Sequence, residues 1–259
     1  MKNYSIITSF NKRIYEAESQ QIVDDMNKNH LDTKFYIYHE NSFEKSIGNE
    51  EINFNNKREN LFLYDVFLEN NWLQNFLETS PFKDCSKYGF PGCLPTHPDH
   101  WKRNSIYWFR KVAALKHCVD IVDTNYLIWL DADTVFRTDR GHTNGFDKPF
   151  FDYTEKFDCS VIKRPDYEAL ETGIIVFNLK KQGKQVINDW LEYYTSLKPF
   201  KHDRWDDGYI LTKVMEQTEN KKYSFGSLRH GIELENQVYR YVRHFKGPLV
   251  EIRDKEKGI

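Results

Sequence analysis

Two carboxylates one residue apart, Asp131 and Asp133, directly follow the uncharged apolar run 126–130. Such a run is typical of a strand buried on both faces of an α/β sheet. Because side chains alternate along an extended chain, both carboxylates are expected to point the same way, with small Ala132 between them. The two charges would repel each other, and a hard divalent cation such as Mg²⁺ or Mn²⁺ would relieve the repulsion. The alternative is a solvated strand end that is acidic and binds no metal.

Three later stretches also carry side chains suited to chemistry. In chain order they are Glu171-Thr172-Gly173 at the start of an apolar run, Trp205-Asp206-Asp207-Gly208, and His244-Phe245-Lys246-Gly247. Each member also has an ordinary structural explanation. These are a cap or surface charge for Glu171, core packing for Trp205, first-turn helix positions for Asp206 and Asp207, a loop hydrogen bond for His244, and a solvated charge for Lys246.

The order of these four stretches resembles that of the nucleotide-sugar glycosyltransferases of the GT-A fold. The likeness is greatest to the retaining kind typified by glycogenin and the bacterial lipopolysaccharide galactosyltransferases (glycosyltransferase family 8). There a metal-binding Asp-x-Asp precedes an Asn-Ala-Gly-type strand entry, an Asp-rich helix start and a late His-Phe-x-Gly. The resemblance spans residues 4–249. Two positions depart from the pattern: Glu171-Thr172 stands where Asn-Ala is usual, and Lys-Pro-Trp is missing after Gly247.

The resemblance implies a site shared by a metal ion and a sugar nucleotide. Asp131, Asp133 and His244 would hold Mn²⁺ or Mg²⁺, with Asp131 also near the donor ribose. The donor, expected to be a UDP-sugar, would be bound by a wider set: Thr8, Ser9 and Phe10 at the nucleobase, Arg110 or Lys111 from a basic helix position, and Lys246 and Gly247 at the diphosphate. The catalytic carboxylates on the sugar and acceptor side would be Asp207, with Asp206 as the second choice, and Glu171.

These residue types suit glycosyl transfer. Cleavage of a sugar from a diphosphate builds negative charge on the leaving phosphate, which a divalent ion and a nearby lysine stabilise. The sugar becomes oxocarbenium-like, and a carboxylate can steady it, orient the acceptor hydroxyl or accept its proton. We expect metal-dependent transfer with retention. The alternatives are an inverting transferase, in which Asp206 or Asp207 is a general base, and a non-catalytic nucleotide-sugar-binding module.

The elements expected from hydropathy would bring these residues together. Short β-favouring runs predict strands at 4–10, 35–38, 126–130, 159–162 and 173–179, and helical spacing predicts helices at 12–30, 61–77, 106–118, 182–197 and from about 206. Loops are expected at 41–60 and 137–158. Ligands bind at the carboxyl ends of strands in open parallel sheets, so the ends of 4–10 and 126–130 should border one site. The predicted class is α/β, and the resemblance implies a GT-A (Rossmann-like) fold with a mostly parallel central sheet flanked by helices.

Length and alternating elements favour a single α/β domain, and the resemblance implies that it is one GT-A domain over residues 1–259. The resemblance implies a nucleotide-binding half, 1–136, and an acceptor-binding half, 137–259.

The formal charge of −2 gives no global attraction for nucleic acid. The acceptor stays open among a glycan, a lipid-linked sugar, a protein and a hydroxymethylated DNA base. Four cysteines without a tight framework, no signal peptide and no transmembrane segment predict a cytoplasmic protein.

Overall fold

A mixed seven-stranded sheet forms the centre of the molecule, in the order β3-β2-β1-β4-β7-β6-β8. The structure, a computed structural model, describes residues 3–46, 48–54, 58–79, 105–137, 145–163, 168–202, 204–218, 223–228 and 238–244. In sheet order the strands are β3 (Leu61–Asp65), β2 (Lys34–His39), β1 (Tyr4–Phe10), β4 (Tyr126–Leu130), β7 (Glu171–Asn178), β6 (Cys159–Ile162) and β8 (Phe225–Leu228). Four neighbouring pairs are parallel, whereas β7 runs antiparallel to β4 and to β6. The predicted α/β class is confirmed.

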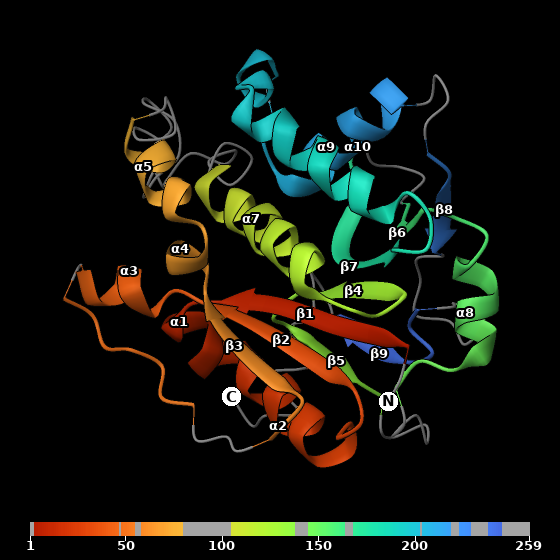
Figure 1. Cartoon of the computed structure of the whole chain (residues 1–259), viewed down its shortest axis with the longest axis horizontal. Helices are drawn as coiled ribbons and strands as arrows, with labels where there is room; N and C mark the ends of the chain where they lie inside the picture. The colour runs from red at the N-terminus through yellow and green to blue at the C-terminus, as the bar shows by residue number, and fades with distance from the viewer. Residues whose placement is uncertain are drawn as a thin grey trace.

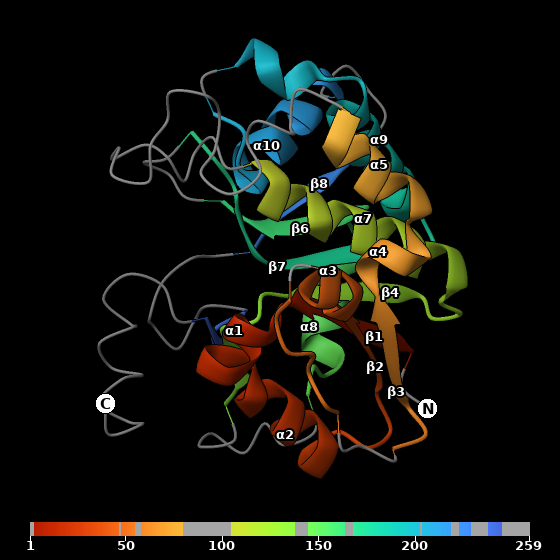
Figure 2. The same ribbon diagram turned by 90° about the vertical axis from the view of Figure 1, so that its left-hand side faces the viewer.

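Helices cover both faces of this sheet (Figures 1 and 2). On one face lie α4 (Val66–Glu69), α5 (Asn71–Thr79), α7 (Ser105–Ile121), α9 (Gly183–Thr195) and α10 (Asp207–Thr218). On the other lie α1 (Lys12–Ile14), a π-helical turn (Tyr15–Ser19) and α2 (Gln20–Asn29). The described helices also include α3 (Asn41–Ser46), α8 (Lys148–Thr154) and a 3-10 turn (Lys198–Lys201). Within the described ranges, no helix has both the length and the apolar character needed to cross a bilayer.

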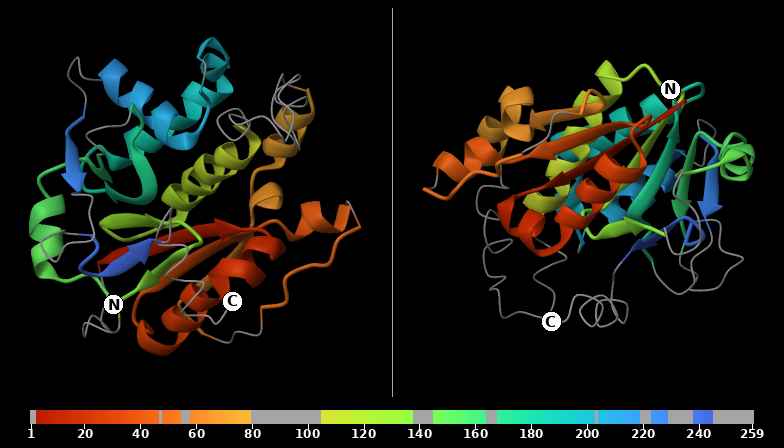
Figure 3. Two further views of the ribbon diagram at one scale, coloured as in Figure 1. Left: turned by 180° about the vertical axis from the view of Figure 1, so that it is seen from behind. Right: turned by 90° about the horizontal axis from the view of Figure 1, so that it is seen from below.

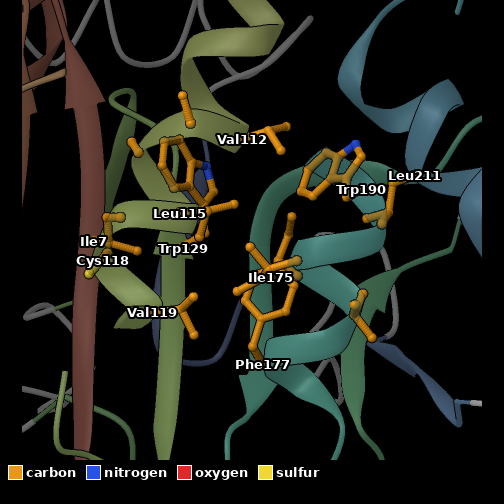
Figure 4. Close-up of a cluster of buried hydrophobic side chains, with 14 of the residues drawn as sticks. Ile7, Val112, Leu115, Cys118, Val119, Trp129, Ile175, Phe177, Trp190 and Leu211 are labelled. Atoms are coloured by element: carbon orange, nitrogen blue, oxygen red, sulfur yellow. The ribbon is translucent and has the colours of Figure 1, made fainter. Parts of the chain in front are cut away.

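Two apolar clusters, one on each face of the sheet, form the core. In β4, Leu127 and Trp129 belong to the cluster under α7 and α9, and Tyr126, Ile128 and Leu130 belong to the cluster that includes α2 and β9. Figure 4 shows the first cluster, where side chains from α7 and α9 meet those of β1, β4 and β7. All five residues of β4 are buried, which explains the uninterrupted apolar run in the sequence.

Three stretches differ from the sequence-based expectations. The helix predicted at 61–77 is wrong over Leu61–Asp65, which forms β3 beside β2, with α4 and α5 following. In that pairing the rings of Tyr36 and Phe62 stack with their centroids 4.7 Å apart, so cross-strand packing outweighs the local helical spacing. The loops predicted at 41–60 and 137–158 contain α3 and α8. The latter begins with Asp147 as its N-cap and a proline in its first turn.

A separate two-stranded sheet joins β5 (Thr134–Phe136) to β9 (Val242–His244) in antiparallel pairing. These strands are seen side by side in Figures 1 and 3. Thr134 lies opposite His244, so the ladder brings a residue from late in the chain beside the segment 131–133. The ring of Phe136 packs against that of His30, at the end of α2, with centroids 4.2 Å apart. The position of β5 therefore depends on the C-terminal end of α2.

That helix end is closed by Arg58. Its guanidinium donates to the carbonyl oxygens of Met26, at 2.6 Å, and of His30 and Thr33. The Met26 and His30 carbonyls also accept the backbone N–H groups of His30 and Thr33, so Arg58 adds a charged donor to the carbonyls that close the helix end.

We expect Arg58→Ala to lower the free energy of unfolding by about 2 kcal/mol, the scale of hydrogen bonds to a charged group. Urea denaturation would measure the change. Arg13→Ala removes an exposed arginine and serves as the matched control. Equal losses in the two variants would contradict the capping role of Arg58.

Candidate active site

Asp131 and Asp133 occupy a turn between β4 and β5. Its closing hydrogen bond runs from the N–H of Thr134 to the carbonyl of Asp131 at 3.0 Å, so the extended conformation expected for this segment is wrong. Both carboxylates nevertheless reach one imidazole. His244 Nε2 lies 3.0 Å from Asp133 Oδ1 and 3.6 Å from Asp131 Oδ2. The turn and the β5–β9 ladder bring the three residues together.

The imidazole of His244 lies against the backbone of β7. His244 is 1% exposed, and a Cβ at position 173 would overlap its ring. The carbonyl of Gly173 also accepts the N–H of Asp131 at 2.7 Å. Glycine is needed at this position because only a residue without a side chain lets the ring approach so closely.

Lys111 of α7 is buried between two carboxylates. Its Nζ lies 2.8 Å from Asp131 Oδ1, pairs with Asp207 Oδ2, and donates to the carbonyl of Thr172 at 3.2 Å. The indole Nε1–H of Trp129 donates to the same Oδ1 of Asp131 at 2.7 Å. Burial alone would lower the pKa of Lys111, but attraction to Asp131 and Asp207 outweighs burial and raises that pKa. Lys111 therefore stays charged and joins α7 to β4, β7 and α10.

The neighbouring carboxylates Asp206 and Asp207 have different partners at the start of α10. Asp206 caps the helix, because its Oδ1 accepts the N–H of Tyr209 at 3.2 Å and its Oδ2 accepts from Nε of Arg204 at 3.0 Å. Burial raises the pKa of Asp206, and Arg204 opposes that shift.

Asp207 accepts the N–H of Gly208 at 2.8 Å through Oδ1 and directs Oδ2 to Lys111. Asp207 is thus linked to Asp131 through Lys111, whereas Asp206 belongs to the helix cap.

Glu171, the first residue of β7, lies at the other nitrogen of the His244 ring. Its Oε1 is 3.7 Å from His244 Nδ1 and accepts the N–H of Gly173 at 3.0 Å. One ligand atom from each of Asp131, Glu171 and His244 lies within 4.8 Å of the others, a spacing at which the three could hold a metal ion. The site therefore offers two overlapping ligand sets, which differ in whether Asp133 or Glu171 completes them. Both consist of carboxylate oxygen and imidazole nitrogen.

The residues predicted at the nucleobase lie at the carboxyl end of β1, beside β4. The β1–β4 pairing ends with Ile7 opposite Trp129, so residues 8–10 continue along the edge where Asp131 follows β4. Thr8 is buried, and its hydroxyl has no hydrogen-bond partner among the described residues. Phe10 is buried against the ring of Tyr15, with centroids 5.5 Å apart, and Ser9 is partly exposed.

Arg110, the predicted alternative to Lys111, has a different environment. Its guanidinium pairs with Glu40, which follows β2, and lies over the ring of Phe43 at 5.1 Å from the centroid. The structure thus brings Lys111 to Asp131 and Arg110 to Glu40. Lys246 and Gly247, predicted at the diphosphate, lie outside the described residues.

Sequence reasoning missed two supporting residues, Trp129 and Arg204. Asp131 follows Trp129 by two residues, so an extended chain would direct both side chains to the same side. This spacing could have identified the indole as a partner of Asp131. Arg204 has no such signal, because its contact with Asp206 depends on the turn that starts α10.

Comparisons with known proteins identify the fold. No family model and no curated protein matches the chain. Among solved structures, a glycosyltransferase involved in glycosylation of the major capsid of PBCV-1 matches with 12% identity over 99% of this chain and 99% of its own, at a TM-score of 0.52. The galactosyltransferase LgtC, in complex with donor and acceptor sugar analogues, matches with 13% identity over 94% of this chain and 87% of its own, at a TM-score of 0.50.

A third match is the glycosyltransferase GlyE of Streptococcus pneumoniae, with 14% identity over 86% of this chain and a TM-score of 0.44. The match spans only 44% of GlyE. From the first two structures, the chain has the fold of the GT-A glycosyltransferases, and the predicted fold is confirmed.

Gly173→Ala should displace the ring of His244, because the added methyl group occupies the place of the imidazole. We expect the free energy of unfolding to fall by about 1–3 kcal/mol, the usual cost of overpacking. The His244 ring resonances should also move in NMR spectra. Ser160→Ala changes a buried position on the neighbouring strand β6 and should leave them in place. Unmoved His244 resonances in Gly173→Ala would rule out the close packing.

Lys111→Met should destabilise the fold by roughly 3–5 kcal/mol, because removing one partner of a buried ion pair leaves the others uncompensated. The raised pKa of Lys111 fixes the pH window. The stabilisation is fully present below the ordinary lysine pKa of about 10.4 and is lost as the pH rises through the higher folded value.

Denaturation at several pH values would measure this loss. Adding Asp207→Asn to Lys111→Met should restore part of the stability, since one of the two carboxylates is then neutral. A double variant as unstable as the sum of the two single variants would contradict the bridge.

Proposed function

We propose that the chain is a metal-dependent glycosyltransferase that moves a sugar from a nucleoside-diphosphate donor, a UDP-sugar, to an acceptor hydroxyl with retention. The observation that carries the proposal is the convergence of Asp131, Asp133 and His244 at the carboxyl end of β4. In open α/β sheets this edge is where ligands bind. The shared fold with LgtC, whose structure holds donor and acceptor sugar analogues, supports a sugar nucleotide as donor.

The residues at this edge fit Mn²⁺ or Mg²⁺. Asp131 and Asp133 would supply carboxylate oxygens and His244 an imidazole nitrogen, a mixed set that suits Mn²⁺ in particular. When bound, the ion would supply positive charge for the leaving diphosphate. On Asp131, Lys111 and Trp129 both contact Oδ1, whereas Oδ2 lies 3.6 Å from His244 Nε2. Oδ2 is therefore the oxygen that would bind the ion.

The end of β1 would hold the nucleobase. The buried hydroxyl of Thr8 offers a donor and an acceptor that the described residues do not use, and a polar ligand would satisfy both. Partly exposed Ser9 follows it along the same edge. We assign Lys246 and Gly247 to the diphosphate on the resemblance alone.

Asp207 is the carboxylate we assign to the sugar and acceptor side. Its Oδ2 is held by Lys111, which keeps it close to Asp131, whereas the oxygens of Asp206 are engaged by Tyr209 and Arg204. A carboxylate paired with a lysine can stabilise an oxocarbenium-like sugar or accept a proton from the acceptor. The anomeric configuration of the product distinguishes the retaining reaction from an inverting one in which Asp207 is the general base.

The experiment that tests the function is a screen for hydrolysis of UDP-, GDP- and other sugar nucleotides in the presence of Mn²⁺. Transfer to glycans, lipid-linked sugars, proteins and hydroxymethylated DNA would then identify the acceptor. Failure to hydrolyse or transfer any sugar, with UDP still bound, would indicate a binding module.

UDP binding should require a divalent ion and depend on Asp133 and His244. In Asp133→Ala and in His244→Ala, the affinity for UDP with Mn²⁺ should fall at least tenfold, about 1.4 kcal/mol or more, measured by calorimetry. Asp152→Ala removes an exposed carboxylate on α8 and should bind normally. Unchanged binding in both folded site variants would remove them from the metal site.

A further inference from the structure

The two nitrogens of the His244 ring face different carboxylates. Nε2 is 3.0 Å from Asp133 Oδ1 and 3.6 Å from Asp131 Oδ2, whereas Nδ1 is 3.7 Å from Glu171 Oε1. His244 and Glu171 are 1% and 4% exposed. The ring therefore lies between the proposed cation position and a buried carboxylate at its other nitrogen.

The backbone of β7 holds Glu171 in this place. Its Oε1 accepts the N–H of Gly173 at 3.0 Å. The register between β6 and β7 shifts here, between Val161 and Ile162, with Ile162 opposite Glu171. Irregularities of this kind re-aim side chains beside functional sites. One short segment thus positions the carboxylate and, at Gly173, admits the imidazole.

We propose that Glu171 is a positioning residue that accepts a hydrogen bond from the Nδ1–H of His244 and leaves the Nε2 lone pair for a cation held between Nε2 and the carboxylates of Asp131 and Asp133. The proposal rests on the metal site proposed above. A neutral imidazole carries one N–H, so a carboxylate at Nδ1 determines which nitrogen can bind a cation. Closing the 3.7 Å separation of Nδ1 and Oε1 by about 1 Å forms the hydrogen bond. Such a carboxylate orients the ring and raises its affinity for metal.

The competing arrangement makes Glu171 a direct ligand, which the 4.8 Å spacing of Asp131, Glu171 and His244 allows. Asp133, however, has the carboxylate nearest to the ring and lies at Nε2. A cation at that nitrogen has two carboxylates beside it, whereas Glu171 lies 3.7 Å from Nδ1. This distribution of carboxylates favours the positioning role.

The first test uses the metal-free protein, at a pH high enough for the ring to be neutral. Without a cation, Asp133 favours a proton on Nε2 and Glu171 favours one on Nδ1. Nitrogen NMR of the isotope-labelled protein should therefore show a measurable population of His244 with its proton on Nδ1, and Glu171→Gln should shift that population toward Nε2–H. Glu168→Gln makes the same change at an exposed position three residues earlier and should leave the tautomer as it is. An identical tautomer in wild type and Glu171→Gln would overturn the proposal.

The second test measures Mn²⁺ affinity by calorimetry. Glu171→Gln should weaken binding by about 10–100-fold, the usual effect of losing the partner of a metal-binding histidine. Glu168→Gln should not weaken it. In a His244→Gln background, Glu171→Gln should add no further loss, because it acts through the ring. A further tenfold loss in that background would make Glu171 a direct ligand and overturn the proposal.

The two proposals fail in different ways. If the wild-type protein binds no Mn²⁺, the metal-dependent function is wrong, and the tautomer of His244 still decides the role of Glu171. If the wild type binds Mn²⁺ and Glu171→Gln binds it equally well, the inference about Glu171 alone is wrong.

Discussion

The buried negative charge at the carboxyl end of β4 is the constraint on which the rest of the structure depends. Asp131, Glu171 and Asp207 converge there, and like charges in a poorly solvated region repel one another. Lys111 offsets part of this charge, because one ammonium is shared by Asp131 and Asp207. The proposed cation beside His244 would offset more of it. The ammonium and the metal ion thus act on the same charge balance from two sides of Asp131.

Backbone pairing, more than local sequence, brings these groups to one place. The β5–β9 ladder sets His244 opposite Thr134, directly after the turn that carries Asp133. Gly173 of β7 receives the N–H of Asp131 on its carbonyl and leaves room for the imidazole. Because helix α7 packs on the same sheet, Lys111 reaches Asp131 from a segment that precedes β4 in the chain. Several distant segments therefore determine the site jointly, and a shift in any one of them alters the charge balance.

How much the sequence predicts depends on whether a signal is local. The sequence predicts the strand at 126–130 because a run buried on both faces has no polar side to interrupt it. The apolar residues of Leu61–Asp65 continue into α4 and predict a helix, and only pairing with β2 makes this stretch a strand. The sequence likewise could not distinguish Arg110 from Lys111. Their different partners, Glu40 and Asp131, follow from the orientation of α7 against the sheet.

The hydrogen bonds of the site give its carboxylates a direction before any ligand binds. On Asp131, Lys111 and Trp129 both contact Oδ1, so Oδ2 is the oxygen on the side of His244. On Glu171, the N–H of Gly173 fixes Oε1, which is also the atom nearest His244 Nδ1. Groups aligned during folding need little reorganisation when a cation and a diphosphate arrive, and this preorganisation favours stabilisation of developing charge. The same bonds that make the buried carboxylates tolerable therefore also orient them for the proposed reaction.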